Sequence, residues 1–288
     1  MDTLTAPARR TAPTSRLVRA ELRWIFRRPR SLAVLALLGV IPVIMGVALT
    51  VSGSPEPSTG GAPGDDQGAG LLSSALGNGL VLPVAALVMT LGMLLPLASA
   101  MSAADALAGE TSTGTLRGWL LAPVSRGRLL AIKAIGVATF TLAAVGVIAV
   151  IGTLTGLVIN GTDTLATMSG TTLPLTDALG RVALAAGWVT IQLWAVAAVA
   201  LAISACTEHP MVVLASVLGG LIVFTVLGNL DALSWLHPFL ITESWWSVID
   251  VLRDPIPFDD LTNGLLVALC YLLIGGSLSY SLLVSRDG

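Results

Sequence analysis

The most constraining feature of the chain is a series of six long segments without a charged residue. A helix that crosses the hydrocarbon core of a bilayer needs about 20 consecutive apolar residues, and each segment is long enough to supply one. The residues that bracket the segments are Arg30 and Glu56, Asp66 and Asp105, Lys133 and Asp163, Arg181 and Glu208, His209 and Asp231, and Asp260 and Arg286. We therefore expect six membrane spans.

The low content of charged residues and the lack of alternation between polar and apolar residues indicate that these spans are helical. Only 11% of the 288 residues are charged, whereas a soluble domain carries about 25%. Lipid offers no hydrogen bonds to free backbone groups, which leaves helices or closed barrels, and the segments lack the alternation of barrel strands. The sequence predicts an all-α polytopic membrane protein with six transmembrane helices and an N-terminal interfacial amphipathic helix.

This fold class divides the chain into segments. The predicted divisions are a disordered cytoplasmic tail at 1–15, the interfacial helix at 16–30, a six-span transmembrane domain at 31–284 and a cytoplasmic tail at 285–288. Within the transmembrane domain we expect an outer loop at 52–70, an inner loop at 105–130 and an outer segment at 231–260.

The second apolar segment is longer than a bilayer requires and contains Pro83 and Pro96. Either this helix tilts and kinks at its prolines, or it continues as a helix beyond the membrane on the inner side. Gly152 and Gly156 in the third segment form a GxxxG pair, which favours local helix packing over a dedicated dimer seam.

The basic residues predict the orientation. Of the 15 lysines and arginines, only Arg181 and Arg253 fall on one side of the six predicted spans, and most of the 17 acidic residues share that side. Because loops rich in lysine and arginine stay in the cytoplasm, both termini are expected there. The preference for arginine over lysine and the high alanine and glycine content favour a bacterial cytoplasmic membrane.

The N-terminal helix has an arginine stripe opposite an apolar side. The stripe residues recur at three- and four-residue spacing: Arg16, Arg19, Arg23, Arg27 and Arg30. This pattern is typical of a helix in the headgroup layer, where anionic lipid attracts basic residues, and Pro29 would turn the chain into the first span. The alternative is a plain topology anchor.

The inner loop at 105–130 contains a short apolar-faced stretch around Leu116 and Trp119, and Ser125 is placed to cap the third span. Charged residues would form the rim of this stretch: Glu110, Arg117, Arg126 and Arg128. Such a surface suits a soluble partner, although an ordinary connecting loop fits the residues as well.

The same loop resembles a family signature. The residues Gly109, Glu110, Gly114, Thr115, Leu116, Pro123, Val124, Ser125, Arg126 and Lys133 match the sequence between spans two and three of the type-2 ABC exporter permeases. The layout also resembles that family, with a basic interfacial helix, six spans and a longer outer segment before span six. The motif covers about 25 residues, whereas the layout covers nearly the whole chain.

The resemblance implies a half-transporter. A second permease chain would complete the pathway, and two copies of a separate ATP-binding-cassette ATPase would dock below. It implies that the inner loop holds the coupling helix, with ATPase-coupling residues Glu110, Gly114, Thr115, Leu116, Arg117, Pro123 and Arg126. The chain has no GxxxxGK[ST] phosphate loop, so that ATP and Mg would bind the partner ATPase, and no cofactor is expected on this chain.

The resemblance also implies a pathway lined by spans two and five. Polar or polarisable residues of these spans are candidate lining positions: Asn78, Met89, Met93 and Phe224. The outer segment at 231–260 would form short helices that cap this pathway, or a plain aromatic belt. Asn78, Gln192 and Asn229 are expected to hydrogen-bond between helices, and Asp177 is spaced to pair with Arg181.

The functional expectation is an exporter of an amphipathic drug, peptide or lipid-like substrate. Ionisable residues in the middle of a span would favour an ion-coupled carrier, and the segments lack them. His209 and His237 lie at opposite faces, which argues against a metal site or an enzyme, and the net charge of −2 gives no reason to expect nucleic acid. The alternative is a non-transporting membrane assembly or sensor protein that docks a cytoplasmic partner.

Overall fold

The computed structural model describes residues 14–52, 71, 74–75, 78–112, 125–161 and 167–285. These residues form helices and no strand, as the sequence predicts. The predicted loop residues 53–70 and the tail residues 1–13 and 286–288 lie outside the described part, as do residues 113–124 of the inner loop. Five of the seven predicted coupling residues lie in that undescribed segment: Gly114, Thr115, Leu116, Arg117 and Pro123.

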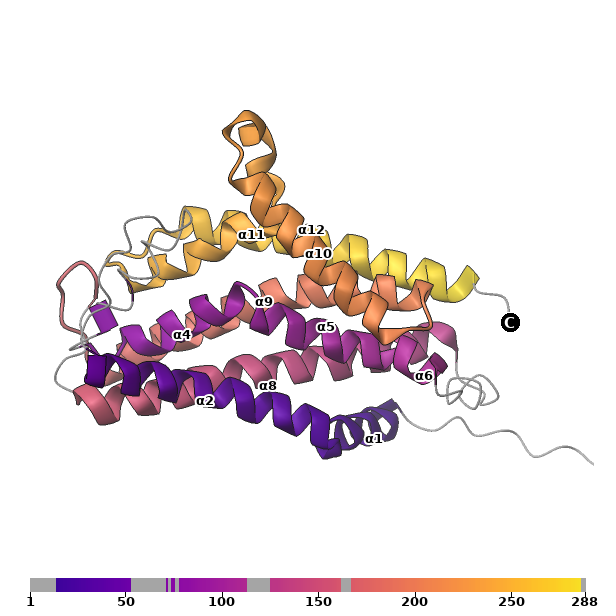
Figure 1. The fold of residues 1–288 in the computed structure, drawn as a ribbon, viewed down its shortest axis with the longest axis horizontal. Helices are drawn as coiled ribbons and strands as arrows, with labels where there is room; N and C mark the ends of the chain where they lie inside the picture. The colour runs from indigo at the N-terminus through magenta and orange to yellow at the C-terminus, as the bar shows by residue number, and fades with distance from the viewer. Residues whose placement is uncertain are drawn as a thin grey trace, which may run out of the picture.

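The helices form an elongated bundle (Figure 1). The helices of the first half are α1 (Thr14–Arg27), α2 (Pro29–Ser52), α4 (Val81–Leu91), α5 (Leu94–Ala106), α6 (Ala108–Ser112) and α8 (Arg126–Asn160). Those of the second half are α9 (Leu175–Cys206), α10 (Pro210–Gly228), η1 (Asp231–Phe239), α11 (Ile241–Ser244), η2 (Trp245–Leu252) and α12 (Phe258–Ser285).

Five helices are long and apolar enough to cross a membrane, and α4 with α5 make a sixth span if counted together. Each of the six expected spans is therefore present among the described residues. Helices α1 and α6 and the C-terminal end of α12 lie at one end of the bundle (Figure 1), which we call the arginine-rich end. The starts of α9 and α12 and the whole of η2 lie at the other, acidic end.

The second span is broken, as its length and prolines suggested. Helix α4 ends at Leu91, α5 begins at Leu94, and the two axes differ by 57°. Pro96 explains the position, because its ring excludes the carbonyl of Gly92 four residues earlier and it has no N–H to donate. Pro83 produces no break, since it lies in the first turn of α4, where a helix needs no donor.

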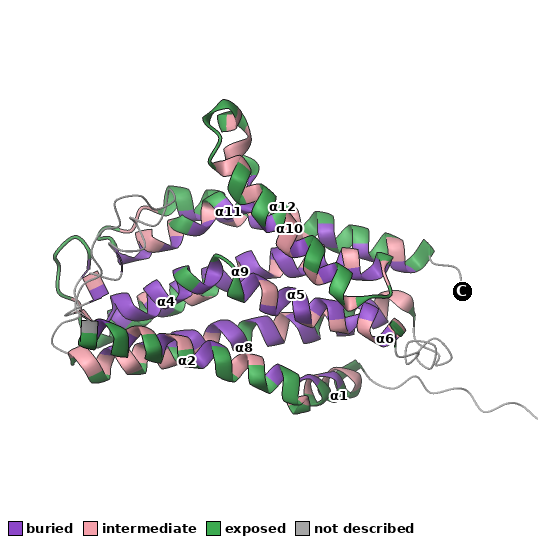
Figure 2. Cartoon of the chain, in the orientation of Figure 1, coloured by how far each residue is buried: buried purple, intermediate pink, exposed green. Residues whose placement is uncertain are grey.

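Helix α9 forms the centre of the bundle. It packs against α5, α8 and α12, and half of its 32 residues are buried (Figure 2). Small residues allow these close contacts. A Cβ added to Gly275 of α12 would lie 2.7 Å from the backbone carbon of Ala198 in α9.

The GxxxG pair of α8 serves packing within the chain, as expected. A Cβ on Gly152 would lie 2.9 Å from the Cα of Pro83, and Gly156 lies directly against the backbone of Gly79. The pair therefore seats the start of α4 on α8.

Helix α10 differs from the other spans. Only three of its residues are buried, Val213, Val217 and Leu221, and it crosses the bundle obliquely towards η1, which stands away from the other helices (Figure 1). No residue of η1 is buried. In contrast, η2 packs on α4, α9 and α12 and buries Trp245 and Val248. The outer segment thus forms short helices as expected, with one standing apart and one embedded.

Candidate functional site

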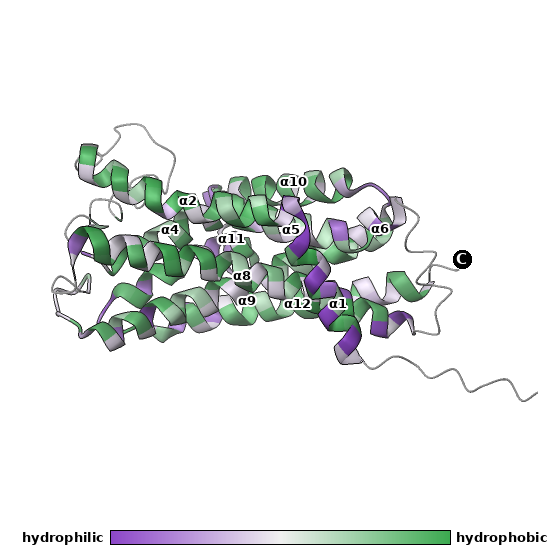
Figure 3. Cartoon of the chain, turned by 90° about the horizontal axis from the view of Figure 1, so that it is seen from below, coloured by the Kyte–Doolittle hydropathy of each residue, from purple (hydrophilic) through white to green (hydrophobic). Residues whose placement is uncertain are grey.

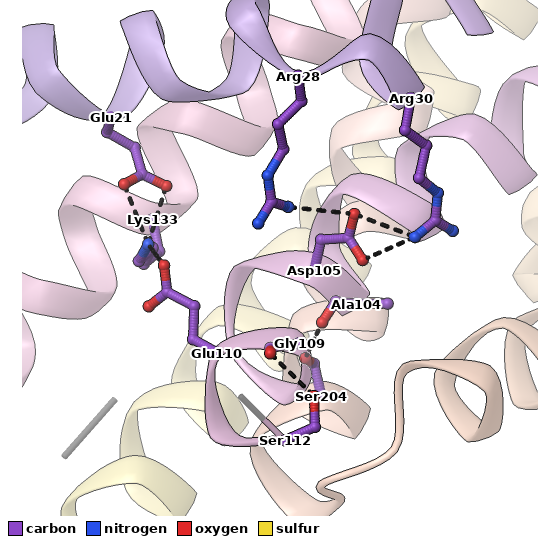
Figure 4. A network of polar contacts seen from close by, with 10 residues as sticks. All are labelled: Glu21, Arg28, Arg30, Ala104, Asp105, Gly109, Glu110, Ser112, Lys133 and Ser204. Carbon is purple, nitrogen blue, oxygen red and sulfur yellow. Dashed lines mark hydrogen bonds and ion pairs between the residues drawn. The ribbon is translucent and has the colours of Figure 1, made fainter. Parts of the chain in front are cut away.

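A buried lysine connects three helices at the arginine-rich end (Figure 4). Lys133 lies two turns into α8, and its side chain is 1% exposed. Its Nζ donates to both carboxylate oxygens of Glu21 in α1, each at 3.0 Å, and to Oε1 of Glu110 in α6. Glu21, Glu110 and Lys133 are called the Lys133 cluster below.

Burial explains why these three charges meet. A charged side chain removed from water is strongly unfavourable unless a partner of opposite charge and hydrogen bonds compensate. Glu21 is 7% exposed and Glu110 is 6% exposed, so that each needs Lys133. Helix α1 approaches closely because Gly136 faces it, and a Cβ there would lie 2.8 Å from Ile25.

The cluster has two carboxylates but one cation, and the pKa of Glu110 is the one that shifts. Burial raises the pKa of the Glu110 carboxyl above its usual range, the charge and hydrogen bond of Lys133 oppose the rise, and the charge of Glu21 adds to it. The arrangement can therefore hold a proton on Glu110 more readily than an exposed glutamate would.

A second ion-pair group joins the corner between α1 and α2 to α5. Asp105 pairs with Arg28 at 3.5 Å and with Arg30 at 3.2 Å, as Figure 4 shows. The guanidinium of Arg28 also stacks on the ring of Trp24, 3.2 Å from its centroid. The Nζ of Lys133 lies 5.4 Å from the same ring, which places Trp24 between the two groups.

Helix α6 is further held by α9. The backbone N–H of Ala108 donates to Oγ of Ser204 at 3.0 Å, and Ser204 in turn donates to the carbonyl of Ala104. Ser204 therefore bonds both sides of the junction between α5 and α6.

The start of α8 is fixed as well. Arg126 donates to the backbone carbonyls of Leu283 at 3.3 Å and Val284 at 2.8 Å, near the end of α12. Ser125 is the residue at the N-cap, as predicted, but its side chain makes no capping hydrogen bond. Both ends of segment 113–124 are thus tied to the bundle, one through Glu110 and one through Arg126.

Two expectations about charged residues need correction. Glu110 does not lie on an exposed rim, because it is buried against Lys133. Arg30 does not continue the arginine stripe, because α1 ends at Arg27 and Arg30 lies in the first turn of α2, bonded to Asp105. The other four stripe residues are exposed on α1 as expected: Arg16, Arg19, Arg23 and Arg27.

At the acidic end, Arg181 does not pair with Asp177. Its guanidinium donates to the backbone carbonyls of Val251 and Arg253 and pairs with Asp254 at 3.2 Å. The reason is that the end of η2 lies against α9 and offers carbonyls without helical partners, which attract a cation. Arg181 thus holds η2 in place.

The three amide side chains differ in whether they bond between helices. Gln192 donates to the Gly264 carbonyl of α12, an interhelical bond as expected, whereas Asn229 donates to Thr225 in its own helix. Asn78 accepts a bond from Leu80 in the turn before α4.

The remaining lining candidates separate into two groups. Met89 is exposed in α4, just before the break, and Met93 is exposed within the break between α4 and α5. Phe224 of α10 packs edge-on against Tyr271 of α12, with 6.3 Å between ring centroids.

The sequence contained one unused signal for the Lys133 cluster. Glu21 is the only acidic residue between Asp2 and Glu56, and Lys133 is the only lysine of the chain. A single acid within a basic helix and a single lysine at the start of a span are both unusual enough to suggest a pair. The roles of Asp105 and Ser204 had no comparable signal.

Comparison with known proteins agrees with this geometry. A family model described as ABC-2 family transporter protein matches residues 16–244, from the start of α1 to the end of α11. No curated protein is significantly similar to the chain in sequence. The match spans the Lys133 cluster and most of the bundle, and the chain belongs to the ABC-2 transporter family, as a membrane permease component of an ABC transporter.

Proposed function

We propose that this chain is the permease subunit of an ATP-driven exporter and that segment 113–124 is its contact with a separate ATPase. The observation that carries the proposal is the Lys133 cluster. It joins α6, which precedes the segment, to α8, which follows it, and to α1. A force applied to the segment by nucleotide-driven closure would therefore move α1, α6 and α8 together.

The arginine-rich end is the cytoplasmic end in this proposal. The charges of α1 and of residues 117–133 support it through the preference of basic loops for the cytoplasm. The membrane is then a bacterial cytoplasmic membrane with both termini inside, and two ATPase copies, each with ATP and Mg, bind below. The coupling roles of Gly114, Thr115, Leu116, Arg117 and Pro123 within the segment remain part of the proposal.

A second permease chain completes the pathway. The exposed apolar face of α10 and η1 supports this, because it includes Ile222, Val223 and Val226 at more than half exposure, with Trp235 and Phe239 beyond. The broken second span, with Met89 and Met93 exposed beside the break, would line the path together with Phe224. The substrate class is amphipathic: a drug, a peptide or a lipid.

The test separates docking from transport. The tagged chain is purified from its native membrane, and the recovered ABC ATPase is quantified by mass spectrometry. R117E within the segment should reduce the recovered ATPase, whereas R253E at the acidic end is the matched charge reversal and should leave it unchanged.

Transport is measured in proteoliposomes with a panel of amphipathic dyes, labelled peptides and labelled lipids. We expect ATP-dependent export by the wild-type complex, and E110Q should lower export per bound ATPase while the complex persists. Stable ATPase binding with no export of any panel member would favour the non-transporting assembly or sensor role instead.

A further inference from the structure

A basic cavity of about 570 Å³ lies along the exposed face of α1. Five arginines line it together with one aromatic ring: Arg16, Arg19, Arg23, Arg27, Arg28 and Trp24. Helix α1 crosses the long axis of the bundle and carries the strongest concentration of hydrophilic colour in Figure 3. The cavity is therefore a charged surface placed across the ends of the membrane spans.

Most of the positive charge of this cavity is not neutralised within the described part of the chain, where Arg28 alone of the five lining arginines pairs with an acid, Asp105. Arg16, Arg19, Arg23 and Arg27 have no hydrogen-bond or ion-pair partner among the described residues. Successive arginines three or four residues apart repel each other on a helix face. The one acid of α1, Glu21, is bonded to Lys133 and is buried. The cavity thus favours an anion from outside the chain.

The chemistry of the lining residues selects a phosphate. A guanidinium presents paired N–H groups that match phosphate oxygens, and the indole of Trp24 suits the headgroup layer of a membrane. We propose that the α1 cavity binds the phosphate of an anionic phospholipid headgroup in the cytoplasmic leaflet.

The cavity shares residues with the coupling apparatus. Trp24 lines the cavity and lies 5.4 Å from the Nζ of Lys133, and Arg28 lines it and pairs with Asp105 of α5. A bound headgroup therefore holds α1 against the Lys133 cluster and makes coupling depend on anionic lipid. The dependence of coupling on anionic lipid rests on the proposed function, whereas the binding of the headgroup does not.

Binding is tested directly by native mass spectrometry of the purified full chain in detergent. Phosphatidylglycerol and phosphatidylcholine are added in equal amounts, and the ratio of the two bound lipids is measured. The wild type should retain phosphatidylglycerol preferentially. R19Q/R23Q should weaken that preference roughly 30-fold, if each lost arginine contributes as basic residues near anionic membranes do.

The matched control is R9Q/R10Q, which removes the same charge from the predicted cytoplasmic tail at 1–15 and leaves every arginine of α1 in place. It should change the preference far less. Equal losses in the two double variants would overturn the proposal in favour of bulk charge, and so would equal retention of the two lipids by the wild type. R19K/R23K keeps the charge without the paired donors and should recover only part of the preference.

A further arm distinguishes a lipid from free phosphate. Inorganic phosphate is added to the chain with phosphatidylglycerol bound, and release of the lipid is followed. Displacement at low phosphate concentration would assign the cavity to soluble phosphate and overturn the lipid assignment. Retention supports the lipid. Because these measurements need no ATPase, their outcome is independent of the proposed function.

The dependence of coupling on anionic lipid is tested in a separate experiment. The complex with its ATPase is reconstituted in phosphatidylcholine vesicles with and without phosphatidylglycerol, and ATPase activity per recovered complex is compared. Phosphatidylglycerol should stimulate the wild type and R9Q/R10Q but not R19Q/R23Q. Equal stimulation of all three would refute the regulation, even where headgroup binding is established.

Discussion

At the arginine-rich end, a lysine with a 1% exposed side chain bonds two carboxylates from two other helices. At the acidic end, Arg181 has a 12% exposed side chain and bonds two backbone carbonyls together with the 39% exposed carboxylate of Asp254. In the first group, every partner is a charged side chain that is buried away from water. In the second group, a guanidinium bonds the backbone carbonyls at the end of η2 and an exposed carboxylate.

Because of this difference, we expect the helices at the arginine-rich end to move as a unit. Removing one partner from a buried charge cluster leaves an uncompensated charge, which a protein tolerates poorly. Helices α1, α6 and α8 therefore stay together whenever one of them shifts. At the acidic end, by contrast, Arg253 and Asp254 are exposed, so that water replaces a lost guanidinium at these two partners at modest cost.

The largest expected effect follows from K133M. The substitution leaves Glu21 and Glu110 buried without a cation, so that we expect a loss of about 3–5 kcal/mol in stability, measured by thermal and denaturant unfolding of the purified chain in one detergent. The triple variant E21Q/E110Q/K133M removes all three charges and should recover most of the loss. Wild-type stability in K133M alone would contradict the importance of the cluster.

R181M should have a smaller and local effect. Loss of hydrogen bonds from a charged donor costs about 1.5–3 kcal/mol in total, and water can replace the guanidinium at the exposed residues Arg253 and Asp254. Unfolding experiments under the same conditions provide the comparison with K133M. ATPase activity per folded complex should stay at the wild-type value. A loss of stability as large as that of K133M would show that the two ends do not differ.

E110Q tests the charge imbalance of the cluster through pH. Because the folded-state pKa of Glu110 lies above the usual 4.5, the folded state binds the extra proton, and this contribution to stability is lost as pH rises through the raised pKa. Glutamine does not titrate. The melting temperature of E110Q should therefore gain on that of the wild type between pH 4.5 and neutral pH. A constant difference across this range would argue against the raised pKa.

D250N provides the corresponding test at the acidic end and should give the smallest effect. Burial raises the pKa of Asp250, the nearby Asp260 adds to the rise, and Arg253, which pairs with it at 3.1 Å, opposes it. The melting temperature of D250N should gain on that of the wild type as pH rises, as it does for E110Q. The gain should be smaller because Asp250 is more exposed than Glu110. D260N, which removes the neighbouring acid, should lower the pKa of Asp250 and reduce the pH dependence.

Much of the fold could be predicted because it depends on patterns local in sequence. Uncharged stretches mark the spans, since charge and lipid are incompatible, and Pro96 marks the break in the second span, since its ring prevents a regular helix. The end of α1 was misplaced by three residues, because the arginine spacing continues through Pro29 to Arg30.

The candidate site was harder to predict because its bonds join distant residues. Glu21 and Lys133 are 112 residues apart, and nothing in a helical pattern specifies which two helices meet. Arg181 was assigned to Asp177 on helix spacing alone, whereas the fold brings the end of η2 and Asp254 to it. Spacing identifies possible neighbours on one helix, but tertiary packing decides which partner is bonded.

We propose that the segment between α6 and α8 faces the cytoplasm and contacts the ATPase. Its most direct test is cysteine labelling of T115C in a C206S/C270S background, with S58C in the predicted outer loop as the control. A membrane-impermeant maleimide should label position 115 in inside-out vesicles but not in spheroplasts, and bound ATPase should reduce the labelling. S58C should behave in the opposite way. Labelling of position 115 from outside spheroplasts would place the segment on the wrong side of the membrane for an ATPase and refute its coupling role.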